Sequence, residues 1–371
     1  MKKNITVIAG DGIGPEVTAE AVKTLQAIAS KFDHDFRLDH RLMGACSIDK
    51  TGDPLPAETI DSCLHSDAIL LGAIGHPKYD NDPSAKVRPE QGLLKLRKEL
   101  QLFANLRPVA AYPSLSHLSP LKEKNLRGVD MIIFRELTGG IYFGEKKLSD
   151  DGSEASDLCS YQEYEIERVA TLAFKSAMQR HKKLTLVDKA NVLETSRLWR
   201  KTVKKIAVDY PAVSVDYMFV DNAAMQLIIN PRQFDVILTE NMFGDILSDE
   251  SSVISGSLGL LPSSSVGEKN ALFEPIHGSY PQAAGKDIAN PLGAILSVAL
   301  MMDHFDLPAE AKLVRDAVEW SLANGFVTTD IDPVNSYSTT TVGELISSFI
   351  GNDIARSINV SNMALGQTTI I

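Results

Sequence analysis

Short apolar runs recur along the chain, and each is followed by a stretch with helical spacing. The runs cover residues 5–9, 66–75, 184–189, 213–221 and 234–240. They are rich in Val, Ile and Leu and end near Gly, Asp or Lys, which is typical of strands buried in a parallel sheet. The predicted helices begin near Pro15, a residue suited to a first helical turn, and cover 192–207, 222–229 and 242–251. This alternation predicts an α/β fold with a mostly parallel sheet.

The segment "RELTGGIYFGE", residues 135–145, has a different pattern. Aromatic and β-branched residues surround a Gly-Gly pair, which predicts an extended arm or hairpin. No internal repeat, coiled coil or low-complexity segment is evident, and no Pro/Gly/Ser-rich linker marks a domain boundary. Domains that interleave along the chain would explain the missing linker.

The composition is that of a globular protein with a sizeable core. The chain has 371 residues, 44% of them hydrophobic and 23% charged, and this length suggests two or three domains. The formal net charge is −11, from 37 basic and 48 acidic residues. Such an acidic balance argues against nucleic acid or an anionic membrane as the main partner.

The cysteines and the N-terminus indicate a cytoplasmic protein. Cys46, Cys63 and Cys159 form neither a CxxC pair nor an even disulfide set, which favours a reducing compartment. The first apolar run is interrupted early by Asp11 and two glycines, and no stretch is long enough to span a membrane. We therefore expect neither a signal peptide nor a transmembrane segment.

The segment "NMFGDILSDE", residues 241–250, contains an unfavourable arrangement. If it is helical, Asp245 and Asp249 lie one turn apart, a like-charge spacing that costs roughly 0.2–0.5 kcal/mol. Together with Asp221 they are hard oxygen donors suited to Mg²⁺ or Mn²⁺. A divalent cation would relieve the repulsion. The simpler alternative is an aspartate stabilised by the helix dipole beside a solvated one.

Other candidates for chemistry are cationic. Arg97, Arg107 and Arg135 each lie among apolar residues. Three converging guanidinium groups would suit a di- or tricarboxylate, although each arginine taken alone is more often a solvated or ion-paired cation. Lys189 follows a predicted strand and fits a base, a substrate cation or an ordinary strand-end lysine. Chemistry in such folds collects at the carboxyl ends of strands, where Lys189, Asp221 and Asp245 are all predicted to lie.

Two glycine-bearing segments were weighed as nucleotide sites. "GDGIGPE", residues 10–16, lacks the third glycine at the spacing of a dinucleotide fingerprint, so a Rossmann site is rejected there. "EPIHGSYPQAAGKDIANP", residues 274–291, places turn residues around a histidine before an apolar helix. This second segment could lie along a nucleotide, although a plain loop is the default interpretation.

Taken together, six segments resemble the β-decarboxylating dehydrogenases, the family of isocitrate and isopropylmalate enzymes. In order they are "GDGIGPE", "FANLRP", "RELTGGIYFG", "DKANVL", "NMFGDILSDE" and "HGSYPQAAGKDIANP". The resemblance covers nearly the whole chain. It implies two interleaved three-layer α/β domains with a large mixed, mostly parallel sheet. The first domain, 1–105 with 258–371, would carry most of the cofactor site, and the second, 106–257, would carry the dimer interface and the arm.

The resemblance also assigns roles to the candidate residues. Arg97, Arg107 and Arg135 would bind the malate carboxylates, with Asp221 also touching the substrate. Lys189 and Asp221 would help remove the hydroxyl proton, and Tyr142 would protonate the enolate. The expected ligands of Mg²⁺ or Mn²⁺ are Asp221, Asp245 and Asp249. Because Lys189 and Asp221 match positions supplied by a neighbouring subunit, the resemblance implies a homodimer with shared sites.

The expected substrate is a small malate derivative with an apolar substituent. Leu93 and Leu94, with Glu90 at their edge, would offer an apolar wall to an isopropyl group, whereas an extra carboxylate would be left unpaired there. This favours NAD-linked oxidative decarboxylation of (2R,3S)-3-isopropylmalate, the third step of leucine biosynthesis. D-malate, tartrate and homoisocitrate are weaker alternatives. A non-catalytic regulatory subunit is a remote one, because the chain keeps every base, acid and metal ligand of the pattern.

The cofactor expectation is NAD. The family's NAD-using members have Asp-Ile at the positions of Gln282 and Ala283, and its NADP-using members have Lys-Tyr. This chain matches neither pair, but it adds no cation for a 2′-phosphate. The expected cofactor-binding residues are Gly75, Glu274, His277, Gly278, Ser279, Gln282, Ala283, Gly285 and Asn290.

Overall fold

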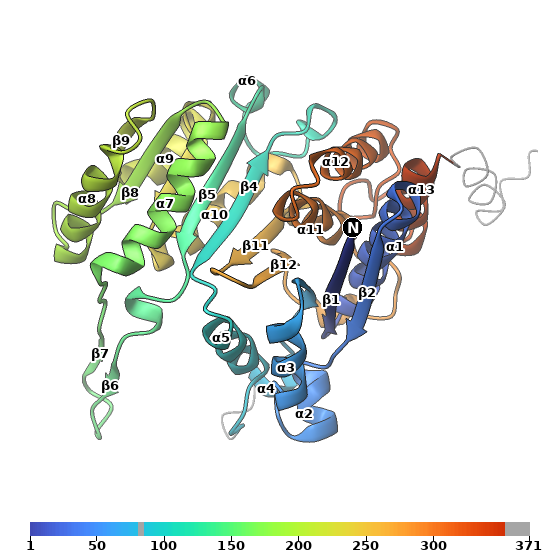
Figure 1. The fold of residues 1–371 in the computed structure, drawn as a ribbon, viewed down its shortest axis with the longest axis horizontal. Helices are drawn as coiled ribbons and strands as arrows, with labels where there is room; N and C mark the ends of the chain where they lie inside the picture. The colour runs from blue at the N-terminus through green and yellow to red at the C-terminus, as the bar shows by residue number, and fades with distance from the viewer. Residues whose placement is uncertain (81–84, 353–371) are drawn as a thin grey trace, which may run out of the picture. The chain divides into compact units, whose positions relative to one another are not determined.

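The computed structural model describes residues 1–80 and 85–352. Its chain divides into two compact units. Unit 1 comprises 1–100, 257–264 and the chain from 270 onward, and unit 2 comprises 101–256 and 265–269. Unit 1 is thus built from both ends of the sequence (Figure 1). The last part of the expected first domain, residues 353–371, lies outside the described residues.

Unit 1 is an α/β unit with parallel strands. The strand order β2-β1-β3-β12 is parallel throughout. Strand β11 (Pro262–Val266) is divided between the units. The other elements of unit 1 are β1 (Lys2–Gly10), α1 (Gly14–Phe32), β2 (Asp35–His40), α2 (Ala45–Thr51), α3 (Ala57–His65), β3 (Ala68–Ala73), α4 (Pro77–Asp80), α5 (Pro89–Glu99), η4 (Leu258–Leu260), β12 (Ala271–Pro275), η5 (Pro281–Ala283), α11 (Leu292–His304), α12 (Pro308–Ala323) and α13 (Thr339–Gly351).

The carboxyl end of β1 is fixed by one buried carboxylate. Asp11 accepts hydrogen bonds from the backbone N–H groups of Ala45, Cys46 and Gly75, at 2.8, 2.8 and 3.0 Å. Each satisfied backbone donor avoids a desolvation penalty of about 1–3 kcal/mol. The glycine motif at 10–16 therefore joins the turn after β1 to the start of α2 and to the loop after β3.

Unit 2 contains the mixed part of the strand arrangement. Strands β5, β10, β8 and β9 are parallel in that order, and β4 pairs antiparallel with β5. Its elements are β4 (Ala104–Ala110), η1 (Pro113–Leu115), α6 (Glu123–Leu126), β5 (Asp130–Glu136), η2 (Gly140–Tyr142), β6 (Lys146–Leu148), β7 (Ala155–Asp157), α7 (Glu163–Gln179), β8 (Lys183–Asp188), α8 (Glu194–Ala207), β9 (Ser214–Phe219), α9 (Val220–Ile229), η3 (Pro231–Gln233), β10 (Val236–Thr239) and α10 (Asn241–Ser255).

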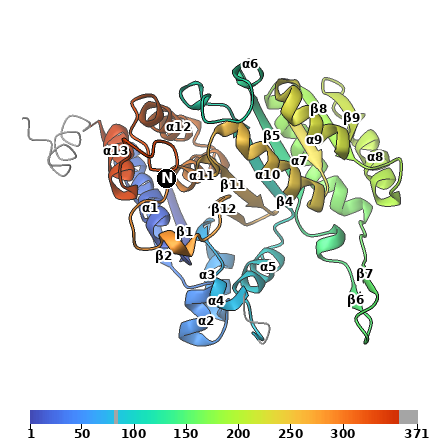
Figure 2. The same ribbon diagram turned by 180° about the vertical axis from the view of Figure 1, so that it is seen from behind.

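Unit 2 has three layers because alternate strand residues enter two separate cores. Leu186 and Leu238 pack with α7 and α8 on one face, and Val187 and Ile237 pack with α9 and α10 on the other. Figure 1 shows α7 and α8 in front of these strands, and Figure 2 shows α9 and α10 from behind. Strands buried on both faces read as continuous apolar runs, which is why the sequence revealed them.

The predicted fold class is confirmed: an α/β protein with a mixed, mostly parallel strand arrangement. The prediction of a hairpin around the Gly-Gly pair was wrong. Arg135 and Glu136 end strand β5, and the Gly-Gly pair leads into the 3-10 turn η2. The hairpin begins only at Lys146, where β6 pairs antiparallel with β7. Aromatic and β-branched residues occur in this turn as they do in strands, so composition alone could not separate the two.

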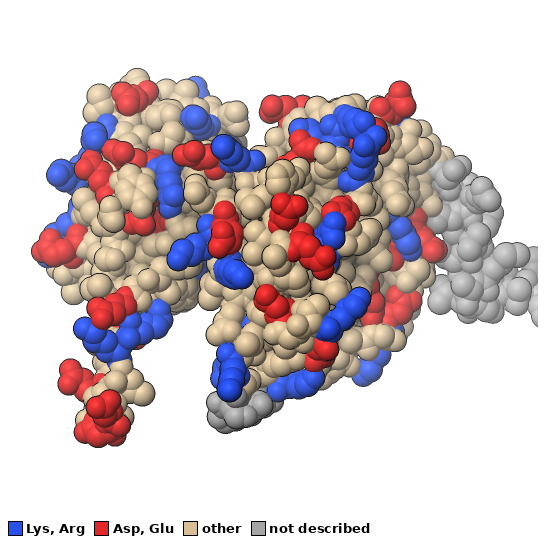
Figure 3. Space-filling model, turned by 60° about the horizontal axis from the view of Figure 1, so that its bottom comes forward, with Lys and Arg blue, Asp and Glu red and all other residues tan. Residues whose placement is uncertain are grey.

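The surface carries charges of both signs. On the face in Figure 3, Lys and Arg are interspersed with Asp and Glu. The β6–β7 hairpin, at the lower left of that view, has lysines in its first strand and acidic residues around its turn, at 150, 151 and 154. In the described part of the chain, no helix combines the length and apolarity that crossing a bilayer requires.

Candidate functional site

Three chemically active side chains lie at the carboxyl ends of adjacent strands in unit 2. Lys189 follows β8, Asp221 lies in the first turn of α9 after β9, and Asp245 lies near the start of α10 after β10. The order β10-β8-β9 makes these strands neighbours. The strand–helix alternation therefore places them at one edge of the parallel strands, as expected for an α/β site.

The most connected group at this edge is the Asp245 carboxylate. Arg135 donates a short hydrogen bond from Nη1 to Oδ1, and Arg107 Nη2 lies 3.6 Å from the same oxygen. The Tyr142 hydroxyl donates to Oδ2 over 3.0 Å. Gly244 makes this approach possible, because a Cβ there would lie 2.6 Å from Arg135 Cγ. We call Asp245 with Arg107, Arg135 and Tyr142 the Asp245 cluster.

The like-charged pair on α10 is compensated within the chain. Arg107 Nη1 lies 2.8 Å from Asp249 Oδ1, while its Nη2 faces Asp245. Ser248 accepts a further hydrogen bond from Arg107 Nη1 at 2.6 Å. One guanidinium group therefore bridges both aspartates. Charge-assisted bonds of this kind offset the roughly 0.2–0.5 kcal/mol repulsion between them.

Tyr142 is held as a neutral phenol. Partial burial is the main cause that raises its pKa above the ordinary value, and the negative charge of Asp245 raises it further. The Arg135 guanidinium carbon lies 5.7 Å from the centre of the Tyr142 ring and opposes the shift. A neutral hydroxyl beside two arginines can donate a proton to a developing carbanion.

Lys189 and Asp221 form a second, more exposed pair. Lys189 Nζ lies 2.6 Å from Asp221 Oδ1, and this hydrogen bond is the main cause that lowers the Asp221 pKa. Within the described residues, no three His, Cys, Asp or Glu side chains come close enough to hold a metal ion. One chain thus brings Asp245 and Asp249 to the bridging Arg107, and it presents Asp221 separately.

The residues expected to select the substrate share one face of helix α5 in unit 1. Glu90, Leu93, Leu94 and Arg97 have the i, i+3, i+4, i+7 spacing of a single helical face, and Leu94 is exposed. Arg97 Nη2 donates to Glu274 Oε1 at 3.0 Å. The Arg97 Nε is buried without a hydrogen-bond partner, so the guanidinium group keeps an unused donor.

A pocket of about 430 Å³ in unit 1 contains part of the expected cofactor site. His277, Gly278 and Asn290 line it, together with apolar side chains that include Ile288. The His277 Nε2 is buried without a partner, and burial lowers the histidine pKa, which leaves a neutral imidazole. An apolar pocket with one orphaned ring nitrogen fits a purine-like ring. The residues therefore fit a nucleotide cofactor.

The other expected cofactor residues do not line this pocket. Gln282 is exposed, Ala283 is buried, and neither lines the pocket. Gly285 N–H donates a short hydrogen bond to Glu16. The remaining residues are placed as follows: Ser279 accepts from Ile13 N–H, Gly75 donates to Asp11, and Glu274 accepts from Arg97.

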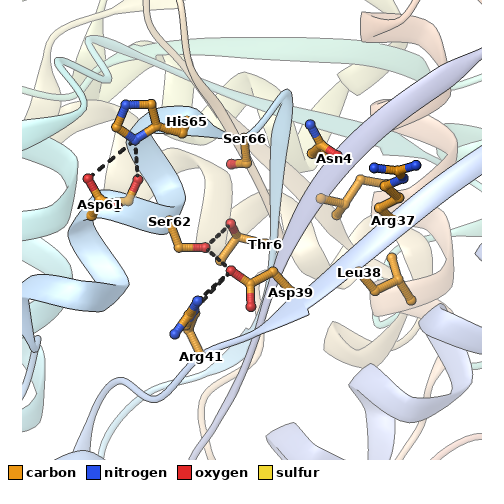
Figure 4. A pocket seen from close by; sticks show the side chains of 11 residues that line it. Asn4, Thr6, Arg37, Leu38, Asp39, Arg41, Asp61, Ser62, His65 and Ser66 are labelled. Carbon is orange, nitrogen blue, oxygen red and sulfur yellow. Dashed lines mark hydrogen bonds and ion pairs between the residues drawn. The ribbon is translucent and has the colours of Figure 1, made fainter.

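A second pocket, of about 330 Å³, lies in unit 1 over strands β1 and β2 beside α3 (Figure 4). Its polar groups largely satisfy one another. Asp39 accepts from Ser62 at 2.7 Å and from Arg41 at 2.9 Å, and Ser62 bonds Thr6. None of the residues expected at the active site lines this pocket.

Sequence reasoning missed two buried amides, Asn105 and Asn241, and one exposed carboxylate, Asp330, near these groups. Asn105 accepts from Arg107 Nε at 2.8 Å, and Asn241 accepts from Arg135 Nε at 3.0 Å. Asp330 lines the cofactor pocket and accepts from Asn290 at 3.0 Å. Asn105 and Asn241 lie within quoted motifs, but a single Asn in a sequence gives no sign that it is buried against an arginine.

Comparison with known proteins identifies the family. The family model described as isocitrate/isopropylmalate dehydrogenase matches residues 4–346. The chain belongs to this family. The 3-isopropylmalate dehydrogenase of Bacteroides fragilis is 53% identical over 352 residues, which is 94% of this chain and 99% of that protein. The 3-isopropylmalate dehydrogenase of Bacillus subtilis is 52% identical over 346 residues, covering 92% and 94% of the two chains.

Solved structures of the family agree with the fold. Isocitrate dehydrogenase from Methylococcus capsulatus has a TM-score of 0.84 at 32% identity, with 94% of this chain and 99% of that chain covered. Membership in the family supports the interleaved α/β fold read from the sequence. It also makes the chain a relative of dehydrogenases that act on small hydroxy acids.

Proposed function

We propose that the protein catalyses oxidative decarboxylation of (2R,3S)-3-isopropylmalate to 4-methyl-2-oxopentanoate and CO₂, with reduction of NAD, in leucine biosynthesis. The Asp245 cluster carries this proposal, because it combines two carboxylate-binding arginines, a metal-binding carboxylate and a neutral phenol. The relatives named as 3-isopropylmalate dehydrogenases support the choice of substrate.

Arg107 and Arg135, with Arg97 of unit 1, bind the substrate carboxylates. Guanidinium groups suit this task because each presents paired donors to one carboxylate. Within the chain these donors contact Asp245, Asp249 and Glu274. Substrate binding therefore exchanges internal ion pairs for pairs with the malate, which orients the substrate and keeps the arginines charge-compensated at every stage.

The acid–base steps fall to Lys189, Asp221 and Tyr142. The pair Lys189–Asp221 accepts the hydroxyl proton as the hydride leaves the same carbon for NAD. The neighbouring carbon, which carries the isopropyl group, then loses its own carboxylate as CO₂, and the electron pair of the broken carbon–carbon bond forms the enolate of the new ketone. Tyr142 gives its proton to the carbon that lost CO₂. Its raised pKa keeps the phenol protonated for this step, as general acid catalysis requires.

Asp245 and Asp249, with Asp221 from a second chain, hold Mg²⁺ or Mn²⁺. Carboxylate oxygens are the donors these ions prefer, and Asp245 and Asp249 lie one helical turn apart. When bound, the divalent cation supplies Lewis-acid stabilisation of the negative charge that develops on the substrate oxygen. The donor set fits, because two hard carboxylates lie side by side and a third is presented on another helix.

The working unit is a homodimer in which each chain lends Lys189 and Asp221 to the other. Helix α9 supports this proposal. Asp221, Met225 and Ile229 have i, i+4 spacing on one face, and the two apolar side chains are 55% and 60% exposed. Ile246 on the adjoining α10 is also exposed. Burying such a face against a second copy gains about 25 cal/mol per Å² of apolar surface.

The nucleotide is NAD, bound in the pocket around His277 in unit 1. Among the described residues that line this pocket, none is Lys or Arg, and Asp330 contributes a carboxylate. A 2′-phosphate dianion would meet repulsion there instead of a cation. The free cysteines of the chain are consistent with work in a reducing cytoplasm.

Selection among family substrates falls to α5. Leu93 and Leu94 face the same side as Arg97, so an isopropyl group gains apolar contact while an additional carboxylate loses solvation. The decisive experiment is a steady-state assay of nicotinamide reduction with isopropylmalate, isocitrate and D-malate, each with NAD and with NADP. A kcat/KM highest for isopropylmalate with NAD is expected. A preference for isocitrate or D-malate would overturn the proposed substrate.

A further inference from the structure

Asn241, the first residue of α10, contacts three residues of unit 2 that are distant from it in sequence: Arg135, Gly139 and Tyr161. Its side chain is 1% exposed. The amide oxygen accepts from Arg135 Nε at 3.0 Å and from Nη2 at 2.8 Å, and the amide nitrogen donates to the Gly139 carbonyl at 3.1 Å. The backbone N–H donates to the Tyr161 hydroxyl at 3.0 Å. Both polar atoms of the Asn241 side chain and its backbone N–H are thus hydrogen-bonded.

The contact with Arg135 fixes the direction of its guanidinium group. Asn241 occupies the edge formed by Nε and Nη2, so Nη1 is directed at Asp245. A neutral amide oxygen holds the group without cancelling its charge, whereas a carboxylate on that edge would compete with an anionic substrate. Preorganised donors bind an anion more tightly because their orientation is set before binding.

The contact with Gly139 fixes the turn that carries the phenol. Gly139 directly precedes η2, which ends at Tyr142. The Tyr161 ring packs against this turn: a Cβ on Gly140 would lie 2.3 Å from the Tyr161 hydroxyl oxygen, and the φ of Gly140 is +73°. Tyr161 is itself held edge-on by Trp199, with ring centres 5.5 Å apart. The turn therefore rests on Asn241 on one side and on Tyr161 on the other.

We infer that Asn241 is a positioning residue that couples the substrate-binding Arg135 to the turn carrying the proton donor Tyr142. This inference rests on the proposed function for the roles of Arg135 and Tyr142. One side-chain amide sets both the direction of the arginine and the place of the phenol, so carboxylate binding and enolate protonation depend on the same residue.

Asn105 provides a matched comparison within the chain. It is also 1% exposed, and its amide oxygen accepts from the Nε of Arg107, the other arginine of the Asp245 cluster, at 2.8 Å. Its amide nitrogen, however, donates to Ser265 Oγ at 3.2 Å and not to the Gly139 carbonyl. Removing Asn105 should disturb one arginine, whereas removing Asn241 should disturb an arginine and the Tyr142 turn together.

The test compares Asn241→Ala, Asn241→Asp and Asn105→Ala with the wild type. The two alanine variants lose a hydrogen bond to a charged group, and the new carboxylate of Asn241→Asp competes with the anionic substrate for Arg135. All three variants should therefore raise the KM for isopropylmalate by about tenfold or more. In D₂O, the wild-type enzyme should deliver one deuteron to a single face of carbon 3 of 4-methyl-2-oxopentanoate. The labelled product is trapped at once by reductive amination. Asn241→Ala and Asn241→Asp should give mixed labelling, and Asn105→Ala should keep single-face labelling.

Hydrogen exchange of residues 138–144 supplies a readout that needs no substrate. Asn241→Ala and Asn241→Asp should speed exchange in this turn, and Asn105→Ala should not. Single-face labelling with unchanged exchange in both Asn241 variants would overturn the coupling, even if KM rose. A KM for isopropylmalate within twofold of the wild-type value in both Asn241 variants would overturn the role of Asn241 in orienting Arg135. If the wild type does not use isopropylmalate, the proposed function fails, and the exchange comparison still decides whether Asn241 holds the turn.

Discussion

Lys189 and Asp221 lie on two adjacent strand–helix junctions and meet at 2.6 Å between Nζ and Oδ1. Lys189 follows β8 and Asp221 follows β9, so the parallel pairing of these strands creates the contact. The Asp221 side chain remains 64% exposed. An exposed ion pair contributes little to folding, about 0–1 kcal/mol. This pair is therefore better explained by its chemistry than by stability.

Complementation between inactive chains tests whether this pair serves a second chain. Arg97→Ala and Lys189→Ala homodimers should each lose most of their turnover. When the two are mixed under conditions of subunit exchange, each heterodimer contains one site with both residues intact, so activity should partly return. Steady-state NAD reduction measures the recovery. Lys183→Ala is the matched control, because Lys183, at the other end of β8, forms a comparable 3.2 Å pair with Asp216 of β9.

Two results would count against a shared site. One is an absence of recovery after mass spectrometry has demonstrated heterodimers. The other is a Lys183→Ala chain that behaves like Lys189→Ala, which would point to a loss of fold.

Metal dependence is the second prediction. Asp245→Asn keeps the size and shape of the side chain but removes the charge of a proposed metal ligand. Turnover should fall by at least about a hundredfold, because the divalent cation supplies several kcal/mol of charge stabilisation. Binding of Mn²⁺, followed by the electron paramagnetic resonance signal of the free ion, should weaken in parallel. Asp216→Asn, a surface carboxylate of the same unit, serves as the control. Undiminished wild-type activity in excess EDTA would contradict the metal assignment.

The sequence was sufficient to predict strands and helices that can be recognised from the pattern of neighbouring residues. The apolar runs at 184–189 and 234–240 became β8 and β10 within one or two residues. The helix predicted over 242–251 begins at Asn241 and continues to Ser255. Continuous apolar runs and helical spacing are properties of neighbouring residues, so one sequence is enough to show them.

Relationships between distant segments could not be read in this way. The contact of Arg107 with Asp245 and the contact of Asn241 with Gly139 depend on how β4, β5 and α10 pack. No spacing rule connects residues more than a hundred positions apart. From the sequence, Asp245 and Asp249 were like charges one helical turn apart, and a metal ion was expected to relieve their repulsion. In the chain alone, Arg107 provides the compensation. Side-chain partners of this kind are set by tertiary packing.

Cofactor preference gives the third prediction. NAD should exceed NADP in kcat/KM by at least about tenfold, or roughly 1.4 kcal/mol, because the His277 pocket offers Asp330 and no cation among its described lining residues. Ile288, which is 37% exposed and lines this pocket, is the place to alter the balance. Ile288→Arg should shift the ratio towards NADP by about tenfold through charge attraction.

Ile288→Gln controls for the change of shape at this position. It has a similar length and polarity without a charge, so its ratio of NAD to NADP efficiency should stay near the wild-type value. Equal use of the two nucleotides by the wild type would overturn the preference. An identical ratio in the Arg and Gln variants would show that this pocket does not face the 2′-position.

The last prediction concerns the pH dependence of stability, and it centres on Glu240, the residue before α10. Its side chain is buried, and burial, assisted by the charge of Glu136, raises its pKa to about 7. In the unfolded chain a glutamate titrates near its ordinary value of about 4.3. Between these values the folded state holds a proton that the unfolded state has released. Folding stability contributed by this group is therefore present below about pH 4.3 and is lost as pH rises through about 7.

Glu240→Gln removes this titration while keeping the shape of the side chain. At pH 8 the variant should unfold at a higher denaturant concentration than the wild type, with a gain on the order of 3 kcal/mol at most, and the two should converge as pH falls towards about 4.3. Urea unfolding at a series of pH values measures the gap. Glu250→Gln is a graded control, because partial burial raises the Glu250 pKa in the same direction but its side chain is less enclosed. A wild type more stable than Glu240→Gln at pH 8 would mean that the ionised carboxylate has a favourable partner, and burial would then not govern its titration.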